Sequence, residues 1–278
     1  MKRILLGLLI LSLAGMAFAG GNNEGRAQAG AQTISVGGST SVTPLMELFQ
    51  AEYGRLNPNV TITVSGTGSG DGITGSASGM YDIGMSSREL RPAEIGQGLE
   101  PITVAIDGIA LIIHNSSPIS NLTTDQVRNI YTGAITRWEQ LGAAANGKTG
   151  GIAVISREPG SGTRGAFQEI LEFSDANLVG NADILDGTGA IRSAVSQNPD
   201  AIGYISSGSI DASVKALNVN GAAPTEANLR NGSYTIARPF ILIIRRGVEP
   251  SPATRAFLDW TRSAQGQAIV SRSWVSVN

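Results

Sequence analysis

The sequence of 278 residues contains no cysteine and a single histidine, His114. Without cysteine the chain forms no disulfide and no thiolate metal site, and one histidine cannot supply a pair of imidazole ligands. A Ser-His-Asp hydrolase site would depend on His114 alone, which ends an apolar run, and the G-x-S-x-G nucleophile motif is missing. We therefore expect no resident metal, no cofactor and no catalysed reaction.

Charge of either sign is also scarce. Charged residues make up 15% of the sequence, the formal net charge is −2, and no run of basic residues occurs. Such a chain is a poor candidate for binding nucleic acid or an anionic membrane surface. Any anion that it binds must therefore be held by local groups rather than attracted by the overall charge.

The chain has one apolar run near its start and none that approaches the ~20 residues of a membrane helix. Residues 1–19 combine a basic start, an apolar stretch over residues 4–13 and small residues before Gly20. This pattern is typical of a secretory signal peptide that is cleaved on export. Met16 stands where a lipoprotein signal would need its acylated cysteine, so no lipid anchor is expected. Residues 20–32 have little to bury and are predicted to form a flexible leader.

Beyond the leader, short apolar runs alternate with amphipathic stretches. The alternation is typical of βαβ units and predicts an α/β protein with mostly parallel sheets. The apolar runs are residues 33–38, 60–66, 102–114, 152–157 and 201–206, and the amphipathic stretches are residues 44–56, 123–133 and 163–171.

Two runs, residues 102–114 and 234–244, are longer than a typical strand. One interpretation is that they cross between two lobes. Lobe one would then comprise residues 33–107 and 238–278, and lobe two residues 108–237. The alternative is that each run is simply a buried central strand, and the sequence leaves both interpretations open.

Glycine is abundant, with 36 residues, and three segments place it with serine and threonine between an apolar run and a helical pattern. These segments are residues 36–45, 64–73 and 155–167. A helix N-terminus presents unpaired N–H groups and about half a positive charge, and hydroxyls add further donors. Each cluster therefore suits an oxyanion, although Ser and Thr are also ordinary helix caps. Arg157 lies four residues before Ser161, where its guanidinium can make a bidentate contact.

The stretch from Arg157 to Thr163 has the pattern R-x-x-G-S-G-T and resembles the phosphate-binding motif of the periplasmic phosphate-binding proteins, the PstS-like family of ABC phosphate importers. The similarity extends through most of the chain after the leader. The other segments that carry it are Gly38-Ser39-Thr40-Ser41, Gly68-Ser69-Gly70, residues 82–88 (DIGMSSR), residues 131–138 (YTGAITRW), Leu141-Gly142 and Ile202-Gly203-Tyr204.

This resemblance implies a type II periplasmic-binding-protein fold. In it two lobes, each a central, mostly parallel sheet flanked by helices, close on a ligand about two hinge crossings. It also implies a monomer that binds inorganic phosphate in the periplasm and delivers it to the permease and ATPase subunits of an ABC importer. Carried over by position, the ligand-binding residues are Ser39, Thr40, Ser41, Ser69, Ser87, Arg157, Ser161, Gly162 and Thr163, with Ser39 as a neighbouring donor.

Ser87 departs from the family pattern. Better-known members have an aspartate at this position, which accepts the proton of hydrogen phosphate and repels sulfate. A serine cannot repel an unprotonated anion in this way. Asp71, in the second glycine-rich segment, and Asp107, at the expected first crossing, are the candidates for the missing acceptor. Capping or turn chemistry is the alternative for each of them.

Two other functions stay open: a binding protein for another tetrahedral oxyanion, sulfate or molybdate, and an exported phosphatase-like hydrolase. Nucleotide binding has weaker support. Residues 142–149 fit the P-loop pattern, yet they follow a helical pattern and precede a strand, so we expect Lys148 to be an exposed turn residue. Gly70-x-Gly72-x-x-Gly75 fits the dinucleotide fingerprint, which is a weak signal alone.

Overall fold

The computed structural model describes residues 31–278, which form one compact unit. The predicted signal peptide and most of the predicted leader lie outside the described residues. Gln32, assigned to the leader from composition, is the first residue of strand β1 and pairs with Val60. That assignment was wrong because a neighbouring strand, which composition does not reveal, extends the pairing to this residue.

Strands and helices alternate along the described chain, as the apolar pattern predicts. The strands are β1 (Gln32–Gly38), β2 (Val60–Gly66), β3 (Ile83–Ser86), β4 (Leu99–Ile113), β5 (Asn121–Leu122), β6 (Ala153–Arg157), β7 (Asp183–Leu185), β8 (Ala201–Ser206), β9 (Lys215–Ala216), β10 (Asn218–Val219) and β11 (Ala237–Arg245). The α-helices are α1 (Thr43–Leu56), α2 (Ser69–Ser78), α3 (Pro92–Gly96), α4 (Thr124–Tyr131), α5 (Gly162–Ile170), α6 (Gly187–Gln197), α7 (Glu226–Arg230), α8 (Pro252–Thr261) and α9 (Ala264–Val270). The 3-10 helices are η1 (Trp138–Ala145), η2 (Asp175–Asn177) and η3 (Ser207–Ser209). Among these helices, none has both the length and the apolar character needed to cross a membrane.

The main sheet runs in the order β2-β1-β3-β11-β4-β8-β6-β7, and β9 pairs with β4. β1 is parallel to β2 and β3, and β6 is parallel to β7 and β8. β11 is antiparallel to β3 and β4, and β4 is antiparallel to β8. Two parallel βαβ groups are therefore joined through a pair of antiparallel strands, and the predicted α/β fold class is confirmed.

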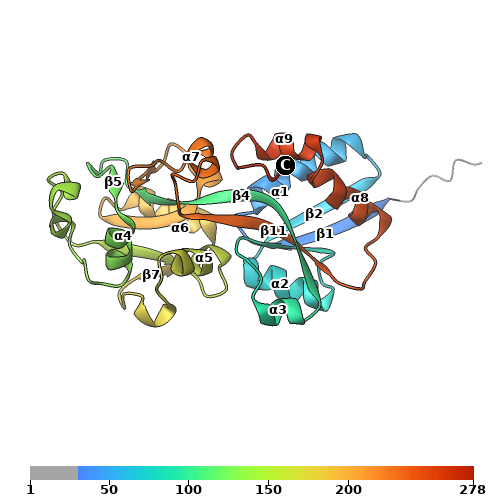
Figure 1. Cartoon of the computed structure of the whole chain (residues 1–278), viewed down its shortest axis with the longest axis horizontal. Coiled ribbons are helices and arrows are strands. Elements are labelled where there is room, and N and C mark those ends of the chain that lie inside the picture. Colours follow the sequence, from blue (N-terminus) through green and yellow to red (C-terminus); the bar gives the residue numbers. More distant parts are fainter. Residues whose placement is uncertain (1–30) are drawn as a thin grey trace, which may run out of the picture. The chain divides into compact units, whose positions relative to one another are not determined.

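The two long apolar runs correspond to β4 and β11, which run side by side (Figure 1). β4 pairs with β11 over residues 99–108 and with β8 over residues 109–113. The predicted lobe boundaries fall where β4 changes its partner. The division into lobes stays a prediction, since residues 31–278 are one unit by their contacts.

Two groups of buried apolar residues pack on either side of this change of partner. One includes Phe49 of α1, Phe240 of β11 and Phe257 of α8. The other includes Tyr131 of α4 and Tyr204 of β8, and here Tyr204 stacks on Phe167 of α5 with ring centroids 4.1 Å apart. Burying a side chain of this size stabilises the folded state by about 1.5–3 kcal/mol. Each group therefore holds together the helices and strands that contribute to it.

Candidate anion-binding site

Four helices begin where the chain leaves a strand or its loop. α1 begins at Thr43, α2 at Ser69, α5 at Gly162 and α6 at Gly187. The first turn of each helix has N–H groups without an intrahelical partner and carries partial positive charge. Gly187 has a φ of 80°, a left-handed conformation that glycine adopts without strain, which allows the sharp entry into α6.

Hydroxyl side chains from the loop before α1, from the first turns of α2, α5 and α6, and from the residue after β3 meet in one largely buried group, the hydroxyl cluster. Its members are Ser39, Thr40, Ser41, Ser69, Ser87, Thr163 and Thr188.

The distances within the hydroxyl cluster are those of hydrogen bonds. The Ser39 hydroxyl donates to Ser87 Oγ at 2.9 Å, and Ser69 Oγ lies 3.3 Å from the same oxygen. Ser41 Oγ lies 2.9 Å from Thr163 Oγ1, although 122 residues separate them. The fold therefore brings the three predicted Gly/Ser/Thr segments to one point.

Arg157 joins the cluster from the end of β6, and its side chain is almost completely buried. Its Nη2 donates to Thr40 Oγ1 at 3.0 Å, and its Nη1 lies 3.5 Å from Thr163 Oγ1. The Arg157 N–H donates to the Tyr204 hydroxyl at 3.2 Å. Burial raises the pKa of Tyr204, which keeps this phenol neutral. Backbone and side chain of Arg157 are thus both held in place.

Glu158 forms a bidentate ion pair with Arg157, because Arg157 Nε and Nη2 each lie 2.7 Å from a carboxylate oxygen. Glu158 Oε2 also accepts the N–H of Gly187 at 3.2 Å. The carboxylate therefore orients the guanidinium, matches its charge and ties both to the start of α6.

Gly162 lies so close to the cluster that any side chain there would force a neighbouring hydroxyl to move. A Cβ atom at Gly162 would be 2.3 Å from Ser69 Oγ and 2.8 Å from Ser87 Oγ. Ser161 is the N-cap of α5, where its hydroxyl accepts the N–H of Arg164 at 3.3 Å. The start of α5 therefore lies next to the hydroxyls of Ser69 and Ser87.

The two carboxylates predicted as proton acceptors do not join the hydroxyl cluster. Asp71 is exposed in the first turn of α2, and within residues 31–278 no hydrogen bond links its carboxylate to a cluster residue. Asp107 is fully buried and pairs with Arg238. Burial raises the pKa of the Asp107 carboxyl, although the Arg238 guanidinium acts against this rise.

Thr188 and Glu158 were not predicted as site residues. Thr188 is 6% exposed, and its hydroxyl lies 3.3 Å from the hydroxyls of both Thr40 and Ser41. It belongs to a Gly-Thr-Gly sequence at the start of α6, the same local pattern as the three predicted segments. That pattern could have identified Thr188. Glu158 gives no such local signal.

The P-loop match at residues 142–149 lies in η1 and the segment before β6, so it does not connect a strand to a helix. The dinucleotide match at Gly70, Gly72 and Gly75 lies in α2, after β2. We expected Lys148 to be an exposed turn residue, and this was wrong. Its side chain is 11% exposed, its Nζ lies 2.8 Å from Asp200 Oδ1, and its Nζ lies 5.4 Å from the Trp138 ring centroid.

His114 Nδ1 lies 2.7 Å from Ser116 Oγ, and no described hydrogen bond links His114 to the hydroxyl cluster. Within residues 31–278, no group of acidic and histidine residues is arranged to hold a metal ion.

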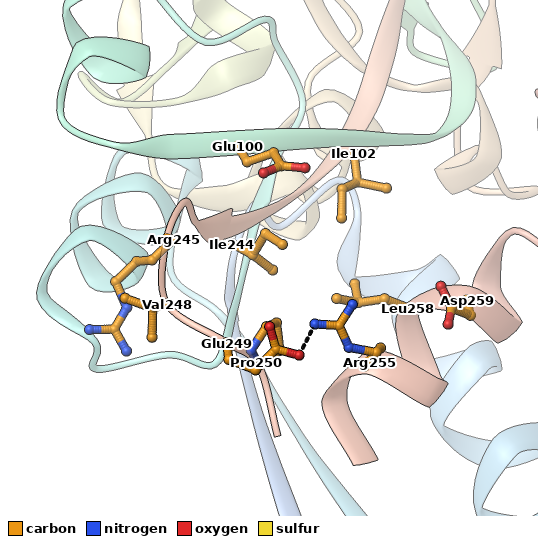
Figure 2. A pocket seen from close by; sticks show the side chains of 11 residues that line it. Glu100, Ile102, Ile244, Arg245, Val248, Glu249, Pro250, Arg255, Leu258 and Asp259 are labelled. Carbon is orange, nitrogen blue, oxygen red and sulfur yellow. Dashed lines mark hydrogen bonds and ion pairs between the residues drawn. The ribbon is translucent and has the colours of Figure 1, made fainter. Parts of the chain in front are cut away.

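A pocket of about 420 Å³ lies elsewhere, between the ends of β4 and β11 and helix α8 (Figure 2). Glu100, Arg245, Glu249, Arg255 and Asp259 line it with several apolar side chains, and Arg255 pairs with Glu249. None of its lining residues belongs to the hydroxyl cluster. Acidic and basic groups alternate around it, so it offers no concentrated charge of one sign.

The hydroxyl cluster and Arg157 together suit a small anion. A hydroxyl hydrogen bond contributes about 0.5–1.5 kcal/mol net and one from a charged donor about 1.5–3 kcal/mol. Desolvating an anion costs far more than any single bond returns, so several fixed donors must converge on it. The buried hydroxyls, the guanidinium and the helix N-termini supply this convergence.

Comparisons with known proteins agree with this chemistry. A family model described as a PBP superfamily domain matches residues 24–265. The phosphate-binding protein PstS of Borreliella burgdorferi is 30% identical over 247 residues, which are 85% of this chain and 87% of that protein. A solved structure from Clostridium perfringens, described as a phosphate ABC transporter substrate-binding protein with bound phosphate, is 41% identical with a TM-score of 0.85, covering 89% of this chain and 100% of that one. An ABC-type phosphate transport receptor from Vibrio cholerae is 32% identical with a TM-score of 0.71, covering 87% and 99% of the two chains. The chain therefore belongs to the PBP superfamily and is a PstS-like member of it.

Proposed function

We propose that this protein binds inorganic phosphate and delivers it to an ABC-type importer. One observation carries the proposal. Hydroxyl groups and Arg157, which come from strands and helices on both sides of the β4–β11 pair, lie within hydrogen-bond distance of one another. Relatives that match over most of this chain are named for phosphate binding, and one has phosphate bound. The proposed ligands are the nine predicted residues and Thr188.

Closure is the step that the proposal requires. Ser39, Thr40, Ser41, Ser69 and Ser87 belong to the predicted lobe one, while Arg157, Thr163 and Thr188 belong to the predicted lobe two. Either set alone would leave some oxygens of a tetrahedral anion without donors. A ligand that contacts both sets favours the closed form by its differential affinity for the two states.

Neutral donors carry most of the proposed binding. Glu158 matches the charge of Arg157, and Asp107 matches that of Arg238. These guanidinium–carboxylate pairs have no net charge, so hydroxyls and backbone N–H groups must add most of the donors that stabilise the anion beside the Arg157 guanidinium. This fits a protein whose overall charge does not attract anions.

We also propose where the protein acts and which partners it has. The relatives are components of phosphate transport, and we place the protein in the periplasm as a monomer, exported through its predicted signal peptide. Its partners would be the membrane permease and ATPase subunits of the importer. It would catalyse no reaction, since the one histidine does not reach the hydroxyl cluster.

Calorimetry tests the proposal on protein that has been unfolded, dialysed and refolded to remove any ligand carried through purification. We expect phosphate to bind more tightly than sulfate or molybdate. Arg157→Ala should weaken phosphate binding at least about tenfold, because a charged hydrogen bond contributes about 1.5–3 kcal/mol. Arg230→Ala, at an exposed ion pair on α7, is the control and should bind as the wild type does.

Three results would contradict the proposal in different ways. Tighter binding of sulfate or molybdate than of phosphate would keep the site and change its ligand. Equal phosphate affinity of Arg157→Ala and the wild type would remove Arg157 from the site. Turnover of a phosphomonoester by the wild type would make the protein a hydrolase.

A further inference from the structure

A buried ion pair joins β4 and β11 where β4 changes its partner. Asp107 and Arg238 face each other in the antiparallel register. Arg238 Nη2 and Nε lie 3.0 Å and 3.2 Å from Asp107 Oδ2. The side chains are 1% and 0% exposed for Arg238 and Asp107 respectively, so the pair is shielded from water.

The contacts of this pair extend in two directions. On one side, Asp107 Oδ1 accepts the hydroxyls of Ser206 at 2.7 Å and Ser207 at 3.2 Å, at the end of β8 and the start of η3. On the other side, Arg238 Nη1 donates to the backbone carbonyl of Ser87 at 3.2 Å. One chain of hydrogen bonds thus leads from β8 through both long strands to the hydroxyl cluster.

Stability alone is a weak explanation for such a pair. Withdrawing two charges from water costs about as much as their attraction returns, and apolar residues of similar volume often serve equally well. Arg238 has five donors in a planar fork, and the pair with Asp107 fixes the orientation of that fork. The remaining Nη1 donor is thereby aimed at Ser87.

Ser87 lies just beyond the pairing of β3 with β11, which ends at Ser86. Ser87 nevertheless makes several contacts at the centre of the site. Its N–H donates to Ser69 Oγ at 3.2 Å, and its hydroxyl accepts that of Ser39 at 2.9 Å. A small rotation of the Ser87 backbone would move the Ser87 hydroxyl out of the cluster.

We propose that Arg238 is a positioning residue of the anion site, which holds the Ser87 carbonyl so that the Ser87 hydroxyl stays in the cluster, and that Asp107 holds Arg238. The proposal rests on the phosphate-binding function for its effect on affinity. The effect of Arg238 on the backbone at Ser87 does not depend on a ligand, so the ligand-free protein should show it.

Amide hydrogen exchange tests the backbone claim on ligand-free protein by NMR. The variant is Asp107→Leu with Arg238→Met, which removes both charges together and leaves no unpaired one. We expect the Ser87 amide to exchange at least about tenfold faster, while amides of β1 keep their protection. Arg238→Lys, which keeps the charge and loses the fork, should change exchange in the same direction. Unchanged exchange at Ser87 in a folded variant would overturn the proposal.

A mutant cycle with phosphate calorimetry tests the effect on affinity. We expect the double variant to bind phosphate about fivefold more weakly, which corresponds to about 1 kcal/mol. In a Ser87→Ala background the same two substitutions should change the affinity less than about twofold, because the hydroxyl that they misplace is already gone. A merely structural role would give the full fivefold loss in both backgrounds, which would overturn the proposal.

The control is Lys148→Met with Asp200→Leu, which removes an ion pair that does not contact the hydroxyl cluster. It should leave phosphate affinity and Ser87 exchange unchanged. Wild-type protein that fails to bind phosphate would contradict the proposed function. The exchange of the Ser87 amide would still decide the role of Arg238 in that case.

Discussion

The hydroxyls of Ser41 and Thr188 lie 3.3 Å apart, although 147 residues separate them in the sequence. Ser41 precedes α1, and Thr188 lies in the first turn of α6. Thr188 also lies 3.3 Å from the Thr40 hydroxyl. The first turn of α6 therefore joins the hydroxyl cluster, beside the first turns of α2 and α5 and the loop before α1.

This contact predicts that Thr188 contributes to binding. Thr188→Ala should weaken phosphate binding by about twofold to tenfold, the effect of losing one neutral hydrogen bond of about 0.5–1.5 kcal/mol. Thr188→Ser keeps the hydroxyl and should bind nearly as the wild type does. Thr74→Ala, at an exposed position on α2, is the control for calorimetry. Wild-type affinity in Thr188→Ala would exclude this hydroxyl from the site.

The close approach of Gly162 predicts a strong effect of a single methyl group. Gly162→Ala places a Cβ 2.3 Å from Ser69 Oγ, so the hydroxyl must move or the two halves of the site must separate. We expect at least about tenfold weaker phosphate binding. Gly54 lies inside α1, and a Cβ added there would have no neighbouring atom within 4 Å. Gly54→Ala should therefore raise the free energy of unfolding by roughly 0.5–1 kcal/mol. Calorimetry and thermal unfolding of both variants check this, and tight binding by Gly162→Ala would contradict it.

The position of Asp71 predicts that it does not select between anions. It is exposed and lines a hollow with Thr74, Met80 and Tyr81 rather than joining the hydroxyl cluster. Asp71→Asn should therefore leave the ratio of phosphate to sulfate affinity unchanged within about twofold. Competition calorimetry measures this ratio. A larger change would restore Asp71 as the proton acceptor that the sequence suggested.

Much of the candidate site was predictable because its signals are local. The segments around Ser41, Ser69 and Thr163 each place Gly, Ser and Thr where a strand gives way to a helix. The start of α6 at Thr188 has the same composition and was missed. The strand before it, β7, is only three residues long and largely exposed, so no apolar run announces a strand there.

Other features depend on contacts that no local pattern encodes. Asp107 was noticed as a carboxylate at an expected crossing, but its partner Arg238 lies 131 residues away. Only the register of β4 against β11 sets the two opposite each other. Lys148 was taken for an exposed residue because its glycine-rich surroundings conceal its contacts with Trp138 and Asp200.

The Arg88–Glu94 pair predicts a pH dependence of stability. Hydrogen bonds from the Arg88 side chain, assisted by the N–H of Arg91, hold the pKa of Glu94 below its ordinary value. A carboxyl whose pKa is lowered by folding stabilises the protein above its unfolded pKa, and this contribution is lost as the pH falls through the folded value. Glu94→Gln should lower the unfolding temperature at pH 7 and reduce the decline of that temperature at acid pH. Thermal unfolding from pH 2.5 to 8 measures both effects, with the exposed Glu47→Gln as the control. Parallel curves for Glu94→Gln and the wild type over the acid range would show that this pair does not contribute.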